Sequence, residues 1–113
     1  MRAYNLRNGK GLSDSVMVAD CLLKRMKGLL GRGELPAGEA LWIKPCTSVH
    51  TFFMKFPIDV IFLSKKSKVV AIKKNLQPNR MTQLYLKAVS VLELPAGTVE
   101  TTATEVGDEI KID

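Results

Sequence analysis

The segment Ile58–Leu63 constrains the fold of this chain more than any other, because it is apolar except for Asp59. A short, continuous apolar run bounded by turn residues is typical of a strand with both faces covered. Pro57 precedes the run and polar residues 64–68 follow it. The run therefore predicts a buried strand, and the rest of the chain must supply its sheet partners and its covering layers.

Other short segments have the composition of strands and are separated by turn residues. Asn8-Gly9 is a hairpin signal, because both positions tolerate positive φ. We expect strands at residues 4–6, 15–19, 40–43, 49–55, 58–63, 68–73, 84–94 and 109–112. This pattern predicts a mostly β (α+β) fold, with a small barrel-like or highly curved antiparallel or mixed sheet.

One segment has helical periodicity. Within Cys21–Leu30 the apolar residues recur at intervals of three and four, which places them on one face of a helix. Asp20 can accept hydrogen bonds from the first free N–H groups, and Gly31 can supply the stop. We therefore expect one main helix in this region.

The length and composition predict a single globular domain spanning residues 1–113. The cysteines, Cys21 and Cys46, are too few for a disulfide framework, and a reducing compartment would keep them as thiols. Residues 1–10 lack the apolar core of a signal peptide, and no apolar run is long enough to cross a membrane. We therefore expect a cytoplasmic protein with no membrane partner.

Four motifs occur in order along the chain: GLLGR at residues 28–32, VHTFFMKFPIDVIF at 49–62, VLELPAG at 91–97 and VGDEI at 106–110. From about residue 15 to the end, the chain closely resembles the bacterial and archaeal family catalogued as domain of unknown function number 192. Leu30 stands where that family usually has methionine. The resemblance implies a small β-rich domain and brings no agreed activity, substrate or cofactor. It points to His50, Met54, Asp59, Glu93, Gly97, Gly107 and Asp108.

His50 is the only histidine in the chain and lies in an apolar segment. Strand spacing would place Cys46, His50 and Met54 on one face. In the structural interpretation, a half-buried imidazole hydrogen-bonds a carboxylate such as Asp59 or Glu93 and ties neighbouring strands together.

The same residue types allow a second interpretation, a small thiol or acid–base enzyme. Cys46 would be the nucleophile, His50 its base, and Asp59 the group that orients the imidazole. An extended strand would hold Cys46 and His50 farther apart than a hydrogen bond, so a turn at residues 47–48 would be required.

Metal binding is a further option for Cys46, His50 and Met54. These ligands are too few for a blue-copper or a structural zinc site, which leaves Cu(I) as the conceivable ion. We expect neither a metal nor another cofactor.

A net charge of +6 is compatible with binding to nucleic acid. The predicted hairpin that ends near Lys74 carries five lysines: Lys65, Lys66, Lys68, Lys73 and Lys74. No aromatic residue lies between them to stack on bases. This third interpretation therefore predicts only weak, non-specific nucleic-acid binding, and lysines also protect strand edges from aggregation.

Of these functions we favour a non-catalytic binding or accessory module over an enzyme. Its surface would gather around Arg32, His50 and Asp59, and its partner would be a protein or a small-molecule ligand. Arg32 could hold an anionic group or pair with a carboxylate. The candidate ligand-binding residues are Arg32, His50, Met54, Asp59 and Glu93.

Overall fold

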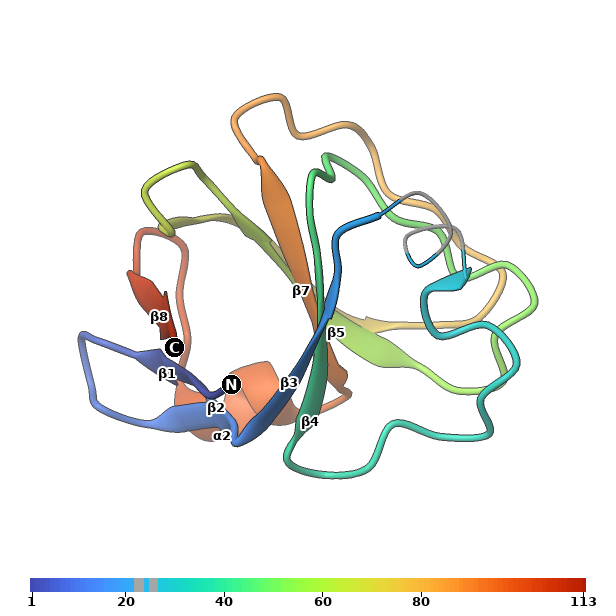
Figure 1. The fold of residues 1–113 in the computed structure, drawn as a ribbon, viewed down its shortest axis with the longest axis horizontal. Helices are drawn as coiled ribbons and strands as arrows, with labels where there is room; N and C mark the ends of the chain where they lie inside the picture. The colour runs from blue at the N-terminus through green and yellow to red at the C-terminus, as the bar shows by residue number, and fades with distance from the viewer. Residues whose placement is uncertain (22–23, 25–26) are drawn as a thin grey trace.

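A computed structural model of the chain describes residues 1–21, 24 and 27–113. The described residues form two sheets and a short helix (Figure 1), so the predicted mostly β architecture is confirmed. The elements are β1 (Ala3–Asn5), β2 (Gly11–Ser13), β3 (Ser15–Ala19), β4 (Glu39–Ile43), β5 (Ile58–Leu63), β6 (Val69–Leu76), β7 (Ser90–Pro95), α2 (Thr98–Thr102) and β8 (Ile110–Ile112).

The larger sheet has five strands in the order β3-β4-β7-β5-β6. β3 and β4 are parallel, and the other neighbours are antiparallel. β5 lies between β7 and β6, and all of its residues are buried. The apolar run at residues 58–63 therefore forms the doubly covered strand that the sequence predicts.

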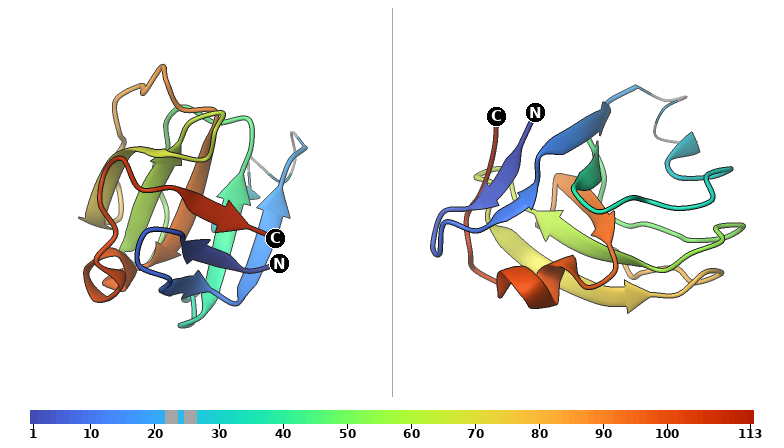
Figure 2. Two further views of the ribbon diagram at one scale, coloured as in Figure 1. Left: turned by 90° about the vertical axis from the view of Figure 1, so that its left-hand side faces the viewer. Right: turned by 90° about the horizontal axis from the view of Figure 1, so that it is seen from below.

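The smaller sheet has three strands in the order β2-β1-β8. It brings the two termini together (Figures 1 and 2): the Arg2 N–H donates to the Asp113 carbonyl at 3.0 Å, and the Asp113 N–H donates to the Arg2 carbonyl at 2.9 Å. An isolated bridge between Lys68 and Glu109 links this sheet to the larger one. The two sheets do not close into a barrel, but the expectation of a mixed sheet is confirmed, because β3 and β4 are parallel while the other neighbours are antiparallel.

The larger sheet separates two hydrophobic clusters. Because side chains alternate along a strand, Val60 and Phe62 of β5 face one cluster, while Ile61 and Leu63 face the other. Loop residues such as Met54 complete the first cluster. The smaller sheet and α2 cover the second cluster, through Ala3, Leu12, Val99 and Ile110. The loop-covered face and the α2-covered face are therefore chemically separate.

Two predicted strands are wrong in part. Residues 49–55 form a loop in which only His50 makes an isolated bridge, to Met81. A turn interrupts the segment, because the Met54 N–H bonds the Thr51 carbonyl at 3.1 Å and Phe53 has a φ of 67°. Residues 84–89 are also a loop, since Tyr85 packs against Phe62 and the strand begins only at Ser90.

The sequence analysis did not anticipate β2 or α2. The predicted helix over Cys21–Leu30 includes residues 22, 23, 25 and 26, which lie outside the described residues. In the part of the chain that is described, no helix has the length and apolar character needed to span a membrane.

Candidate functional site

A pocket of about 220 Å³ lies on the loop-covered face, between the ends of β4 and β7 and the loop that follows β4. Apolar side chains form part of its wall: Leu29, Leu30, Ile43, Val49 and Met54. The polar residues that line it are Lys27, Cys46, Ser48, His50 and Glu93. We call this cavity the Glu93 pocket, after the buried carboxyl group that lines it.

Glu93 lies on β7, where its neighbours in register are Leu41 of β4 and Val60 of β5. It is only 4% exposed, and it makes no hydrogen bond or ion pair with any other described residue. Burial without such a partner raises the pKa of the Glu93 carboxyl to about 8. The carboxyl is therefore mostly protonated at neutral pH, and it can ionise when a cation enters the pocket.

Cys46 is half-buried in the wall of the same pocket. Its thiol Sγ donates to the Ser48 carbonyl at 3.0 Å, and its backbone N–H donates to the Val89 carbonyl at 3.0 Å. These bonds fix the first residues of the loop that follows β4. They place the thiol beside the cavity as a hydrogen-bond donor.

His50 is exposed, which differs from the half-buried environment expected for it. Its Nδ1 accepts the Phe52 N–H at 3.3 Å, and its ring stacks on the Phe52 ring with centroids 5.3 Å apart. Because Nδ1 is an acceptor, the hydrogen-bond geometry assigns the proton of the neutral ring to Nε2. His50 thus offers the pocket mouth a donor, and no described carboxylate is bonded to it.

Asp59 lies on the opposite, α2-covered face. Its Oδ1 accepts the Asn75 N–H at 2.8 Å, and its Oδ2 accepts the N–H groups of Gly97 at 3.1 Å and Val99 at 2.9 Å. These bonds satisfy the amides at the start of α2. Strand alternation places Asp59 with Ile61 and away from Val60, so the sheet separates it from His50. The Cys46–His50–Asp59 triad considered from the sequence is therefore not assembled.

Arg32 is not among the residues that line the Glu93 pocket. Its guanidinium pairs with the Glu39 carboxylate at 3.2 Å, and both side chains are about one-third exposed. Of the predicted site residues, the structure thus brings together Cys46, His50, Met54 and Glu93, and it places Arg32 and Asp59 elsewhere. Among the described residues, Asp59 lies across the larger sheet from His50, so these two do not share one surface with Arg32.

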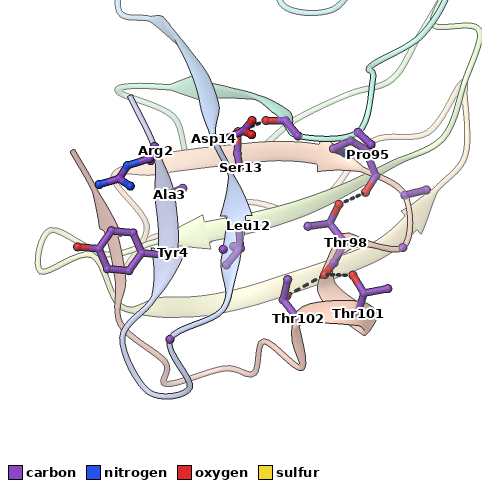
Figure 3. A pocket seen from close by; sticks show the side chains of 16 residues that line it. Arg2, Ala3, Tyr4, Leu12, Ser13, Asp14, Pro95, Thr98, Thr101 and Thr102 are labelled. Atoms are coloured by element: carbon purple, nitrogen blue, oxygen red, sulfur yellow. Dashed lines mark hydrogen bonds between the residues drawn. The ribbon is translucent and has the colours of Figure 1, made fainter.

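A larger pocket of about 750 Å³ lies between β1, β2 and the start of α2 (Figure 3). Three of its hydroxyl groups already have partners within the protein: Ser13 donates to the Gly38 carbonyl at 2.7 Å, and Thr98 donates to the Pro95 carbonyl at 2.7 Å. Thr102 likewise donates to the Thr98 carbonyl at 2.7 Å. The carboxylate that lines this pocket, Asp14, is exposed, whereas the Glu93 carboxyl is buried.

The other candidate chemistries have less structural support. Within residues 1–21, 24 and 27–113, no three side chains of His, Cys, Asp or Glu are grouped to hold a metal ion. The predicted hairpin is present, because β5 and β6 pair antiparallel. Its lysines Lys65, Lys66 and Lys68 are exposed. Lys74 pairs with Glu100 at 3.0 Å. Exposed lysines on a hairpin also serve to keep the strand edge solvated and prevent aggregation, so they do not by themselves indicate nucleic-acid binding.

Leu29, Leu30 and Ile43, which form part of the apolar wall, are not among the predicted site residues. The sequence signal for a pocket at this place is Glu93, because it is a carboxyl in an otherwise apolar strand. Strand alternation makes this position inward-facing.

Comparisons with known proteins agree with the resemblance found in the sequence. Residues 4–112 match the family DUF192, described as Uncharacterized ACR. A UPF0127 protein from Pyrococcus furiosus is 34% identical over 112 residues, which cover 95% of this chain and 94% of that protein. A UPF0127 protein from Pyrococcus horikoshii is 36% identical over 101 residues, which cover 85% of each.

Two crystal structures share the fold at low sequence identity. A protein of unknown function from Novosphingobium aromaticivorans has a TM-score of 0.78 and 22% identity, over 86% of this chain and 74% of that one. A Sinorhizobium meliloti protein, provisionally named a transcription regulator, has a TM-score of 0.80 and 22% identity, over 97% of this chain and 89% of that one. At this identity the likeness concerns the fold alone.

Proposed function

We propose that this chain, which belongs to the DUF192 family, is a non-catalytic binding module that takes a small molecule with a basic nitrogen into the Glu93 pocket. The observation that carries the proposal is the carboxyl of Glu93, which is 4% exposed, borders a cavity and has no partner among the described residues. A buried polar group without a partner destabilises a fold, and native proteins satisfy nearly all such groups. A ligand would satisfy this one.

The chemistry of the pocket defines the class of ligand. An ammonium group beside Glu93 would shift the carboxyl to its charged form and make a charge-assisted hydrogen bond with it. Met54, Ile43 and Val49 would contact the hydrocarbon part of the ligand. The volume of about 220 Å³ suits a short aliphatic amine better than a nucleotide or a peptide.

Titration calorimetry with n-butylamine, and with 1-butanol as the neutral control, tests this function. We expect the wild type to bind the amine and Glu93→Gln to bind it at least roughly tenfold more weakly, because the amide cannot ionise. Binding must displace the proton of Glu93, so the affinity should rise about tenfold per pH unit below pH 8 and level off above it. Equal amine binding by the two proteins, or an affinity independent of pH, would contradict the proposal.

The thiol-enzyme alternative remains worth testing, because Cys46 lies in the same pocket. The thiol of Cys46 is half-buried and donates to a carbonyl, whereas Cys21 is exposed. We therefore expect iodoacetamide to alkylate Cys21 faster than Cys46 near neutral pH, with peptide mass mapping to assign each site. Faster alkylation of Cys46, abolished in His50→Ala, would favour the enzyme.

A further inference from the structure

Two neighbouring loops expose a group of large apolar side chains next to the Glu93 pocket. The loops are residues 44–57 and residues 77–89, which extend from the top to the right of Figure 1. Hydrogen bonds join them: the Thr51 N–H donates to the Arg80 carbonyl at 2.8 Å, and the Tyr85 N–H donates to the Thr47 carbonyl at 2.9 Å. The exposed large apolar side chains are Phe52, Phe53, Met81, Leu84, Leu86 and Val89. We call this group the loop surface.

The exposure of these side chains is large. Phe53 is 84% exposed and Leu86 is 85% exposed, while Met81 lies opposite His50 in the bridge that joins the loops. Soluble domains commonly expose single apolar side chains, whereas here six lie on two loops that are hydrogen-bonded to each other, and we interpret them as an interaction site.

The backbone at Phe53 supports a functional role. Its φ of 67° lies in the left-handed region, which bulky residues rarely adopt. The Asn79 side chain holds this conformation, since its Oδ1 accepts the Phe53 N–H at 3.2 Å. Because the Phe53 ring is mostly exposed, its packing contributes little to the stability of the fold and does not offset the strained backbone. Such strain is typically maintained at functional sites.

The charge of the two loops is entirely of one sign. They contain four basic residues, Lys44, Lys55, Arg80 and Lys87, and no aspartate or glutamate. Lys55, Arg80 and Lys87 are exposed. A second copy of the chain would bring these like charges together, which disfavours self-association through this surface. The partner must therefore be apolar in part and negatively charged.

We infer that the loop surface docks the protein on a lipid surface that carries anionic head groups. Apolar side chains projecting from loops can enter the boundary between head groups and acyl chains, while nearby lysines attract anionic lipids. An acidic peptide would instead need a groove or a free strand edge, and the apolar residues here project from loops. This inference departs from the expectation of no membrane partner, but surface docking needs no spanning segment and so agrees with the absence of a spanning helix in the described residues.

Co-sedimentation with vesicles tests this inference independently of the Glu93 pocket. We expect the wild type to sediment with vesicles that contain phosphatidylglycerol and to remain in solution with vesicles of phosphatidylcholine alone. The double variant Phe53→Ser/Leu86→Ser should bind at least roughly tenfold more weakly, because two apolar side chains no longer enter the lipid. Lys55→Glu/Lys87→Glu should also weaken binding, and salt should weaken binding of the wild type.

Val106→Ser is the matched control, because Val106 is 63% exposed in the turn before β8 and lies outside both loops. It should bind like the wild type, and unchanged melting temperatures would show that all variants fold. The inference is overturned if the wild type does not sediment with anionic vesicles. It is also overturned if Phe53→Ser/Leu86→Ser binds these vesicles as well as Val106→Ser does. Equal binding of the wild type and Phe53→Ser/Leu86→Ser to soluble polyglutamate, without sedimentation on vesicles, would indicate an acidic protein partner instead.

Discussion

At the scale of single residues, Glu93 combines an unfavourable position for folding with a favourable position for binding. Its register neighbours, Leu41 and Val60, are buried apolar residues of two adjacent strands. A buried carboxylate without a partner costs several kcal/mol, so the group takes up a proton instead. A hydrocarbon side chain at this position would pack without that cost, and for this reason we propose a ligand-binding role for Glu93.

Replacing Glu93 with glutamine should change how stability depends on pH. The folded-state pKa of about 8 lies above the ordinary value of 4.5, so the stability that comes from proton uptake is fully present below pH 4.5. It is lost as the pH rises from 4.5 to 8, by at most about 1.4 kcal/mol per pH unit. Urea unfolding across this range should show the loss in the wild type and not in Glu93→Gln. Parallel pH profiles for the two proteins would contradict the burial of an unpaired carboxyl.

Candidate site residues can be recognised in the sequence, but the sequence does not show which of them lie close together in the fold. Asp59 and Glu93 lie on antiparallel neighbouring strands, but Asp59 is opposite Leu94 and Val60 is opposite Glu93. A shift of register by one residue would have placed both carboxylates on the same face. Register depends on pairing between segments far apart in the chain, so no local pattern predicts that the sheet separates Asp59 from His50.

At the scale of elements, α2 shows how tertiary contacts create a helix that local propensity does not predict. Its sequence, TVETT, is rich in β-branched residues, and a helix of five residues is too short to be stable alone. Its N-cap residue is Gly97, which has no side-chain cap. The cap comes from β5, where Asp59 accepts two N–H groups of this turn, and burial of Val99 anchors the helix.

Asp59→Ala should therefore destabilise the protein through α2. The change leaves the N–H groups of Asn75, Gly97 and Val99 without their acceptor, and we expect a loss of about 3 kcal/mol of unfolding free energy. Amide hydrogen exchange should accelerate first in residues 97–102. The control is Glu100→Gln, which removes only the exposed ion pair with Lys74 and should cost less than about 1 kcal/mol. Equal effects of the two changes would exclude the capping role.

The wrongly predicted elements have the same origin. Residues 49–55 have an apolar, strand-like composition, yet Thr51 is drawn into the core, where its hydroxyl donates to the Gln77 carbonyl at 2.6 Å. That contact bends the chain into a loop. The run at residues 58–63 was predictable because its apolar residues have no alternative to burial.

At the scale of the whole molecule, a polar network fastens the smaller sheet. Asp108 is buried in the turn before β8 and accepts hydrogen bonds from Arg7 Nε at 2.6 Å, Asn5 Nδ2 at 2.8 Å and the Glu105 N–H at 2.8 Å. The bonds from Asn5 and Arg7 connect residues about one hundred positions apart. If residues 1–113 are a single domain, as we propose, breaking this network should weaken the whole fold rather than release one sheet.

Asp108→Asn tests that statement. The Arg7 guanidinium holds the pKa of the Asp108 carboxyl well below its ordinary value of 3.8. A lowered pKa contributes stability that is present above about pH 4 and is lost as the pH falls further. At neutral pH we expect Asp108→Asn to lower the unfolding free energy by about 2–3 kcal/mol, because hydrogen bonds to a charged acceptor are among the strong ones.

The acid branch and the shape of the transition make this prediction specific. Below about pH 4 the wild type should lose stability that Asp108→Asn has already lost, so the two unfolding curves should converge. Glu105→Gln is the control, because its carboxylate is exposed and lies 3.5 Å from the same guanidinium. Both variants should unfold in one transition by circular dichroism and calorimetry. Two separate transitions in Asp108→Asn would instead show that the small sheet unfolds by itself, and residues 1–113 would then not behave as one cooperative unit.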